Sequence, residues 1–181
     1  MKILLSFCIV FLLGAFEERL VKTDPEFSQK RGKLYYENQE FTGIQWEYRD
    51  DGTLQGSTSY KSGLRHGKAY RWHQNGILAS DRTYLNGKKH GVHFAWHANG
   101  KKRFYYQFLK GVYQGDNWVW HSNGSKAEYF KFTDGRQSVH KKWRPEGKIF
   151  WNTVMASGKD WGLKGGRLCN PIQGDSNEQV R

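Results

Sequence analysis

The chain has 181 residues, a formal net charge of +12, an aromatic content of 16% and only two cysteines, Cys8 and Cys169. This length leaves no room for a second globular domain, and the scarcity of cysteine excludes a disulfide-stapled mini-domain. The many aromatic residues favour a β-rich fold over a helical bundle. The positive charge indicates either anionic partners, such as phosphate, sulfate or carboxylate groups, or lysines that protect exposed strand edges.

Residues 1–16 have the layout of a secretory signal peptide. Lys2 precedes an apolar run that is too short to span a bilayer comfortably. We therefore expect export to the periplasm, the cell envelope or the medium, with the segment either cleaved after Ala15 or kept as an uncleaved anchor. No other membrane span is expected. After cleavage no internal disulfide could form, and nucleic acid is not an expected partner of an exported protein.

A repeat with a period of 24 residues is expected to occupy residues 33–150, after an N-terminal linker at 17–32. Two of its columns are aromatic: Tyr48, Trp72, Trp96 and Trp120, and then Tyr60, Tyr84, Phe108 and Phe132. Two others are glycine: Gly43, Gly67, Gly91 and Gly115, and then Gly52, Gly76, Gly100 and Gly124. Such self-similarity predicts an array of supersecondary units, each of which needs its neighbours to cover its apolar face.

Each unit is predicted to form one β-hairpin. In the unit at 91–106, residues alternate with period two until Asn99-Gly100, a pair typical of a type I′ turn. The glycines at Gly111 and Gly115 then allow the chain to reverse again into the next unit. The predicted fold class is therefore all-β: an elongated antiparallel meander of stacked β-hairpins.

Alternation also predicts which side chains share a face of the sheet. Phe94 and Trp96 fall on one face of their strand, and His93, Ala95 and His97 fall on the other. We expect the tryptophan-bearing face to be buried and apolar and the opposite face to be polar. The tryptophans are then core residues rather than a ligand cage.

The two ends of the array are expected to differ from its middle. Terminal repeats of a finite array are degenerate because they cap it. Residues 151–170 lose the period but keep apolar residues among glycines, which predicts a closing hairpin or cap. Residues 171–181 are polar, which predicts a disordered tail.

The unit Tyr84-x-x-Gly87-x-x-x-Gly91-x-x-x-x-Trp96-x-x-Asn99-Gly100 resembles the bacterial variant of the MORN repeat. The likeness extends over the repeats before and after this unit. It implies an elongated antiparallel β-array that acts in binding or scaffolding. Eukaryotic relatives are associated with membrane lipids and protein assembly, and bacterial relatives are often labelled antitoxin-like. The export signal departs from the antitoxin picture, because neutralising a cytoplasmic toxin does not require export.

Six basic residues form a candidate binding row on the polar face: Arg49, Arg71, His73, His97, His121 and Arg144. Equivalent positions in a hairpin array lie about 9.5 Å apart. Zinc–nitrogen bonds are about 2.0–2.1 Å long, so we expect no metal site. The row either binds an anionic polymer or an array of head groups, more strongly in mild acid, or consists of histidines that each order their own Asn-Gly turn.

No catalytic arrangement is expected. Asp81, Asp116, Glu128 and Asp134 occupy different phases of the repeat, and no glycine-rich loop precedes a helix. We therefore expect a protein without enzymatic activity and without a cofactor. Protein–protein scaffolding at the cell envelope is the leading hypothesis. Binding of anionic lipid head groups or acidic glycans through the basic row, and antitoxin-like inhibition of a partner protein, are the alternatives.

Overall fold

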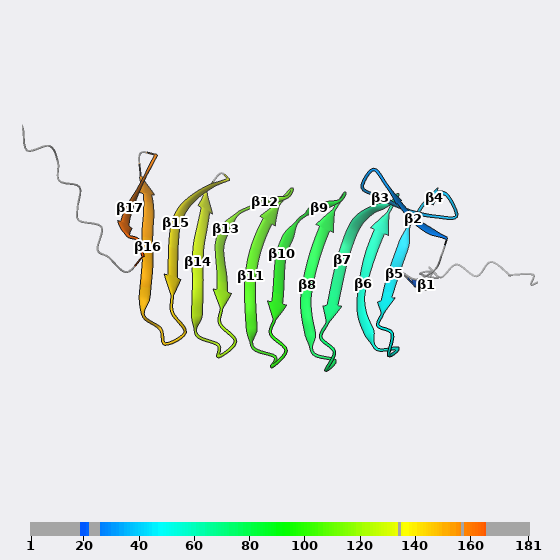
Figure 1. Cartoon of the computed structure of the whole chain (residues 1–181). Helices are drawn as coiled ribbons and strands as arrows, with labels where there is room; N and C mark the ends of the chain where they lie inside the picture. The colour runs from blue at the N-terminus through cyan, green and yellow to red at the C-terminus, as the bar shows by residue number, and fades with distance from the viewer. Residues whose placement is uncertain (1–18, 22–25, 134, 157, 166–181) are drawn as a thin grey trace, which may run out of the picture.

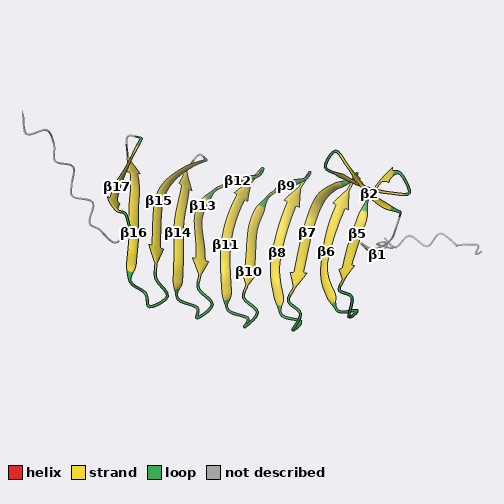
Figure 2. Ribbon diagram, in the orientation of Figure 1, coloured by secondary structure: helices red, strands yellow, loops and turns green. Residues whose placement is uncertain are grey.

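The computed structural model describes residues 19–21, 26–133, 135–156 and 158–165, and within these ranges regular structure consists of β-strands (Figures 1 and 2). The main sheet has 14 strands, in the order β1-β5-β6-β7-β8-β10-β11-β13-β14-β15-β16-β17, with β9 beside β8 and β12 beside β11. From β5 onward, hydrogen-bonded neighbours are antiparallel. The all-β meander of hairpins is thus confirmed. The predicted signal peptide and tail, with both cysteines, lie outside the described residues.

The strands of the main sheet are β1 (Arg19–Val21), β5 (Gly43–Tyr48), β6 (Leu54–Lys61), β7 (Leu64–Trp72), β8 (Leu78–Leu85), β9 (Lys88–Lys89), β10 (Gly91–Trp96), β11 (Lys102–Leu109), β12 (Val112–Tyr113), β13 (Gly115–Trp120), β14 (Lys126–Thr133), β15 (Arg136–Trp143), β16 (Ile149–Ala156) and β17 (Lys159–Leu163). A small second sheet contains β2 (Phe27–Lys30), β3 (Lys33–Tyr36) and β4 (Gln39–Glu40). In Figure 1 the main sheet runs as one layer from cyan to orange, and the small sheet lies at its blue end.

The segment predicted to be a linker, residues 17–32, contains two strands, so that prediction is wrong. β1 pairs in parallel with β5, with Arg19 opposite Ile44, and β2 forms a hairpin with β3. The small sheet is joined to the main one where Leu34 N–H donates to Gly63 O over 2.8 Å. The repeat columns gave no sign of β1, because pairing with the first hairpin needs only the free backbone groups of its edge strand.

At the other end, a hairpin lies in the region predicted to close the array. β16 pairs with β17, with Val154 opposite Trp161. β16 begins at Ile149, two residues before the predicted boundary.

The turns at the Asn-Gly pairs that follow the repeat tryptophans, Asn75-Gly76, Asn99-Gly100 and Asn123-Gly124, are not of the predicted type I′. Gly100 N–H donates to His97 O over 2.9 Å, and His97 N–H donates to Lys101 O over 2.8 Å. Only Gly100 has a positive φ, +78°, so a type I turn is followed by one left-handed residue, which shifts the register of the hairpin. The reason lies in Asn99, whose Oδ1 accepts from Lys101 N–H and thereby favours an Asx turn.

Type I′ turns occur instead at the opposite ends of the strands. Lys110 and Gly111, with φ of +49° and +94°, join the paired residues Leu109 and Val112. The same turn recurs at Ser62-Gly63 and Asn86-Gly87. The residue before the glycine differs from one of these turns to the next. Because a glycine alone does not specify a two-residue turn, the sequence did not reveal these turns.

Two of the sequence columns meet across each hairpin. Gly91 lies opposite Phe108, and Gly67 lies opposite Tyr84. The other two pairs are Gly43 with Tyr60 and Gly115 with Phe132. A glycine leaves room for a ring to pack over the neighbouring strand. The rings of Tyr84 and Phe108 are accordingly 7% and 5% exposed.

The most buried face of the sheet is not the one predicted. His93 and Ala95 are each 2% exposed, whereas Phe94 and Trp96 are only partly buried. In a single layer, side chains are covered only by their neighbours within that layer. The rings of Phe94 and Trp96 therefore stay partly exposed, whereas His93 is covered by the rings of Tyr84 and Phe108 on either side of it. The prediction that the tryptophan-bearing face forms the core is wrong for this reason.

Strand register assigns the side chains to two faces, the tryptophan face and the His93 face. The tryptophan face carries Trp46, Tyr70, Trp72, Phe94, Trp96, Tyr105, Trp118, Trp120, Tyr129 and Trp143. The His93 face carries Gln45, Glu47, Thr58, Arg71, Ser80, Arg82, Tyr84, His93, Ala95, Phe104, Tyr106, Phe108, Asn117, Phe130 and Thr153.

Gly100→Ala should lower the free energy of unfolding by about 1–2 kcal/mol, because an L-residue is strained at a φ of +78°. No heavy atom lies within 4 Å of the added Cβ, so the cost is conformational rather than steric. Urea denaturation followed by tryptophan fluorescence measures it. Gly100→Asn is the control, since asparagine tolerates this region better. Equal losses of unfolding free energy in the two variants would contradict the left-handed conformation assigned to Gly100.

Candidate functional site

Most of the predicted basic row forms a seam between hairpins. Each side chain in this seam reaches the backbone carbonyl of the tryptophan in the next hairpin. His97 Nε2, for example, lies 2.9 Å from Trp120 O, and because a carbonyl only accepts, Nε2 carries the proton. The equivalent bonds join His73 to Trp96 O, His121 to Trp143 O and Arg49 to Trp72 O. The histidines therefore tie neighbouring hairpins together and do not order only their own turns.

An asparagine ladder runs beside this seam. Asn99 Nδ2 donates to Ser122 O over 2.7 Å, and Asn75 and Asn123 make the corresponding bonds to Ala98 O and Pro145 O. Asp51 has no amide to donate. Its carboxylate accepts instead from the hydroxyl and N–H groups of Thr53, and these bonds lower the pKa of Asp51. Both donors of the repeated turn, histidine and asparagine, are thus used to fix the spacing of the hairpins.

Two members of the predicted row do not take part in the seam. Arg71 lies on the His93 face and pairs with Glu47, at 2.5 Å between Nη1 and Oε2. Gly56 lies between them in register, and a Cβ there would be 2.4 Å from Arg71 Nη1, so only glycine lets the arginine cross to its partner. The Arg144 guanidinium lies over the ring of Phe150, 5.4 Å from its centroid. The structure therefore does not bring all six residues into one surface.

The tryptophan face presents partly buried rings in lateral contact. Trp118 stacks with Trp120 at 6.3 Å and with Trp143 at 6.4 Å between ring centroids, and Tyr129 lies 4.4 Å away. Lys126 Nζ lies 5.3 Å from the Trp118 centroid, within the range of a cation–π contact. This face combines broad aromatic surfaces with ammonium groups.

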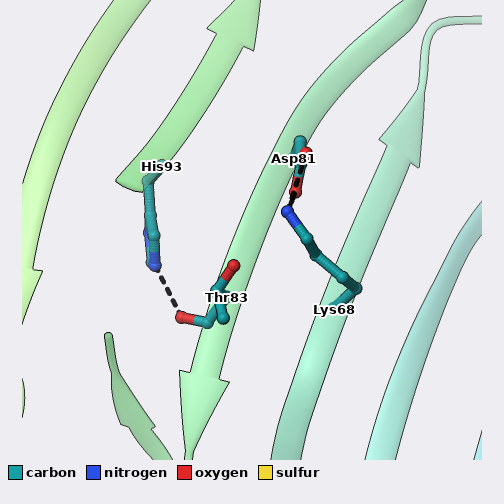
Figure 3. A network of polar contacts seen from close by, with 4 residues as sticks. All are labelled: Lys68, Asp81, Thr83 and His93. Atoms are coloured by element: carbon teal, nitrogen blue, oxygen red, sulfur yellow. Dashed lines mark hydrogen bonds and ion pairs between the residues drawn. The ribbon is translucent and has the colours of Figure 1, made fainter. Parts of the chain in front are cut away.

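Figure 3 shows an ion pair between β7 and β8 and a buried histidine of β10; by strand register the ion pair lies on the tryptophan face and the histidine on the opposite face. Lys68 Nζ is 2.8 Å from a carboxylate oxygen of Asp81. His93 Nε2 donates to Thr83 O over 2.7 Å, and its ring lies 4.7 Å from that of Phe108. Burial lowers the pKa of His93, so the neutral imidazole is favoured in the folded protein.

Asn117 takes the place of His93 in a later hairpin and is fully buried, at 0% exposure. Its Oδ1 accepts from Gln107 N–H over 2.9 Å, and its Nδ2 donates to Gln114 O and Gly115 O. Every strong hydrogen-bonding capacity of the amide is used, as burial requires. The sequence analysis did not single out Asn117, although its position two residues after a repeat glycine was an available signal.

Within the described ranges, no three histidine, cysteine, aspartate or glutamate side chains gather closely enough to hold a metal ion. No helix in that part of the chain has the length and hydropathy needed to cross a membrane.

No protein-family model matches the chain, and a search of curated proteins finds no match. The contacts within the chain therefore define the candidate site.

His97→Leu should lower the free energy of unfolding by about 1 kcal/mol, because it removes the bond to Trp120 O. His66→Leu is the matched control. His66 forms a hydrogen bond with the exposed amide of Asn86, which water can satisfy in its absence. Urea denaturation of both variants measures the difference. Equal stabilities would show that the seam contributes nothing.

Acidification from about pH 7.5 to about pH 5.5 should destabilise the protein partly through His93. Because its folded-state pKa is lowered, the unfolded chain takes up the proton first as the pH falls through about 6.5, and stability present above that pH is lost. Arg82 and Lys89 act in the same direction, and Asp81 opposes them. His93→Gln should therefore show a smaller change in urea midpoint between the two pH values. An unchanged pH dependence would contradict this role.

Proposed function

We propose that this chain is an exported, non-enzymatic binding protein that uses the tryptophan face to dock a partner protein at the cell envelope. The observation that carries the proposal is the set of partly buried aromatic rings on one face of a single-layer sheet. Tryptophan and tyrosine are enriched among the residues that dominate binding energy at protein interfaces, since they combine a large apolar area with few rotatable bonds.

The arrangement of the rings supports a protein partner of extended shape. Trp72, Trp96 and Trp120 end successive outgoing strands and are only partly buried. Equivalent strands are separated by about 9.5 Å, so the rings form an extended row rather than a closed pocket. Lys102 and Lys126 lie over Trp120 and Trp118, at 5.9 and 5.3 Å from their centroids. A partner with apolar anchors and an acidic rim would complement such a surface.

The repeat type and location are parts of the same proposal. The glycine–aromatic pairs and the recurring turns support assignment to the bacterial variant of the MORN repeat. The layout of residues 1–16 supports export. Antitoxin-like inhibition is the case in which the docked partner is a toxin, and it requires that residues 1–16 do not direct export.

Binding of anionic lipid head groups or acidic glycans through the basic row is the second candidate. It is less well supported, because Arg49, His73 and His97 each donate a hydrogen bond to the next hairpin. The positive net charge still allows weak attraction to polyanions, which salt would screen.

The test is affinity capture from envelope extract with wild-type protein and with Trp96→Ser/Trp120→Ser. The wild type should retain a discrete protein at high salt, and the double variant should bind it at least about a hundredfold more weakly, since interface tryptophans commonly contribute 2 kcal/mol or more each. Val112→Ser, which changes an exposed apolar residue of the short strand β12, is the control. Thermal melts check that each variant folds. Undiminished binding by the double variant, or capture of lipid or glycan at low salt only, would contradict the proposal.

A further inference from the structure

We propose that the His93 face holds a separate site for the oxyanion of a small molecule, a phosphate or carboxylate group, formed by Arg65, Arg71, Ser80 and Arg82. This site lies on the opposite side of the sheet from the tryptophan face. It does not depend on the function proposed above.

Two cavities meet at these residues. The larger, of about 460 Å³, lies between the small sheet and the first hairpins of the main sheet, with Leu34, Gln45 and Tyr60 among its lining residues. The smaller, of about 120 Å³, is lined by residues of β6, β7 and β8. Arg65 and Arg71 line both cavities. The smaller cavity has the size of a single polar group, and the larger has room for the rest of a small molecule.

The smaller cavity contains two hydrogen-bonding groups without a partner. Ser80 is 3% exposed, and its Oγ makes no hydrogen bond within the described part of the chain. Arg82 Nε is also buried without an acceptor. Both residues line this cavity. A buried donor without an acceptor is costly, and two of them at one small cavity indicate that an acceptor from outside the protein belongs there.

The charges around the cavity favour an anion. Glu47 balances Arg71, to which it is paired. In the described part of the chain, no ion pair within 4 Å involves Arg65 or Arg82. Two guanidinium charges are thus left without a carboxylate partner on this side of the sheet.

Ring contacts hold these two guanidinium groups in place. The Arg65 guanidinium lies 5.5 Å from the centroid of Tyr84, and that of Arg82 lies 5.9 Å from the centroid of Phe104. A guanidinium placed in this way is preorganised to donate two parallel hydrogen bonds to a phosphate or a carboxylate. The hydroxyl of Ser80 would supply a further donor to the same oxyanion.

The residues that follow Ser80 across the sheet in the next hairpins show that the polar cavity is confined to this part of the sheet. Ser80 lies opposite Ala95, Ala95 lies opposite Phe104, and Phe104 lies opposite Val119. The row is apolar as far as Val119, and it then continues to Glu128 and Lys142, which form an ion pair with each other. The repeat itself therefore does not require a hydroxyl or an arginine at this place, and packing alone does not account for them.

Isothermal titration with inorganic phosphate and with citrate, at constant ionic strength set by sodium chloride, tests the site in the full chain. The wild type should bind at least one of these anions with a heat that chloride does not reproduce. Arg82→Gln should weaken this binding about tenfold or more, since it removes a charge-assisted donor. Arg103→Gln is the matched control, because it makes the same charge change at an exposed residue next to Phe104, on the tryptophan face.

Ser80→Ala separates binding from folding. It leaves the net charge unchanged and removes a buried hydroxyl that has no partner, so the free protein should melt at the same or a higher temperature. Anion affinity should fall roughly fivefold, the contribution of one hydrogen bond. Absence of specific binding by the wild type, unchanged affinity in Ser80→Ala, or an equal loss in Arg103→Gln would overturn the proposal.

Discussion

A sheet without a second layer can bury its side chains only against their neighbours within that layer, and this constraint governs the structure. His93 is covered because its ring lies between those of Tyr84 and Phe108, at 5.6 and 4.7 Å. No other layer of the described chain covers these rings in the middle of the sheet. Cohesion must therefore come from lateral contacts: the glycine–aromatic pairs, the stacked rings and the bonds that connect successive turns. Each hairpin depends on the next, as expected for a repeat array.

The same constraint explains why polar groups on the His93 face are so fully paired. Asn117, which is buried without any covering element, uses its whole amide on the backbone groups of Gln107, Gln114 and Gly115. Glu47, at 5% exposure, is paired with an arginine that reaches it across Gly56. Against this background of satisfied groups, the unpartnered Ser80 Oγ and Arg82 Nε are exceptions. An exception of this kind, at a cavity and close to uncompensated positive charge, is better explained by binding than by packing.

The sequence predicted the fold where spacing was sufficient, and it failed where three-dimensional contacts decide. The hairpin meander follows from alternation and regularly spaced turn residues. The type I′ turn was predicted at the wrong end of the strands, because Asn99 uses its side chain on the backbone of its own turn, whereas the pair Lys110-Gly111 carries no strong local signal. The prediction of the buried face was wrong, because in a single layer burial depends on the rings that flank a side chain and not on its own size.

The candidate site was predicted only in part, because three-dimensional contacts also decide which side chains are available to bind. A column of basic residues is visible in sequence, but whether its donors face solvent or a carbonyl is set by how closely adjacent hairpins approach. The structure brings Arg49, His73, His97 and His121 to such carbonyls, and it leaves Arg71 on the His93 face, paired with Glu47. No pattern with the repeat period could reveal Ser80 and Arg82, because they are departures from the repeat rather than members of it.

The separation of roles proposed for the two faces has a physical origin. Side chains on the His93 face are small or embedded between rings, so they can be fully buried and can line a polar cavity. Rings on the tryptophan face are only partly buried, and under the proposed function a partner protein covers their apolar surface. The seam of histidines and asparagines fixes the spacing between hairpins, and with it the spacing of both surfaces. Weakening the seam should therefore disturb docking on one face and anion binding on the other together, whereas substitutions within either surface should act on that surface alone.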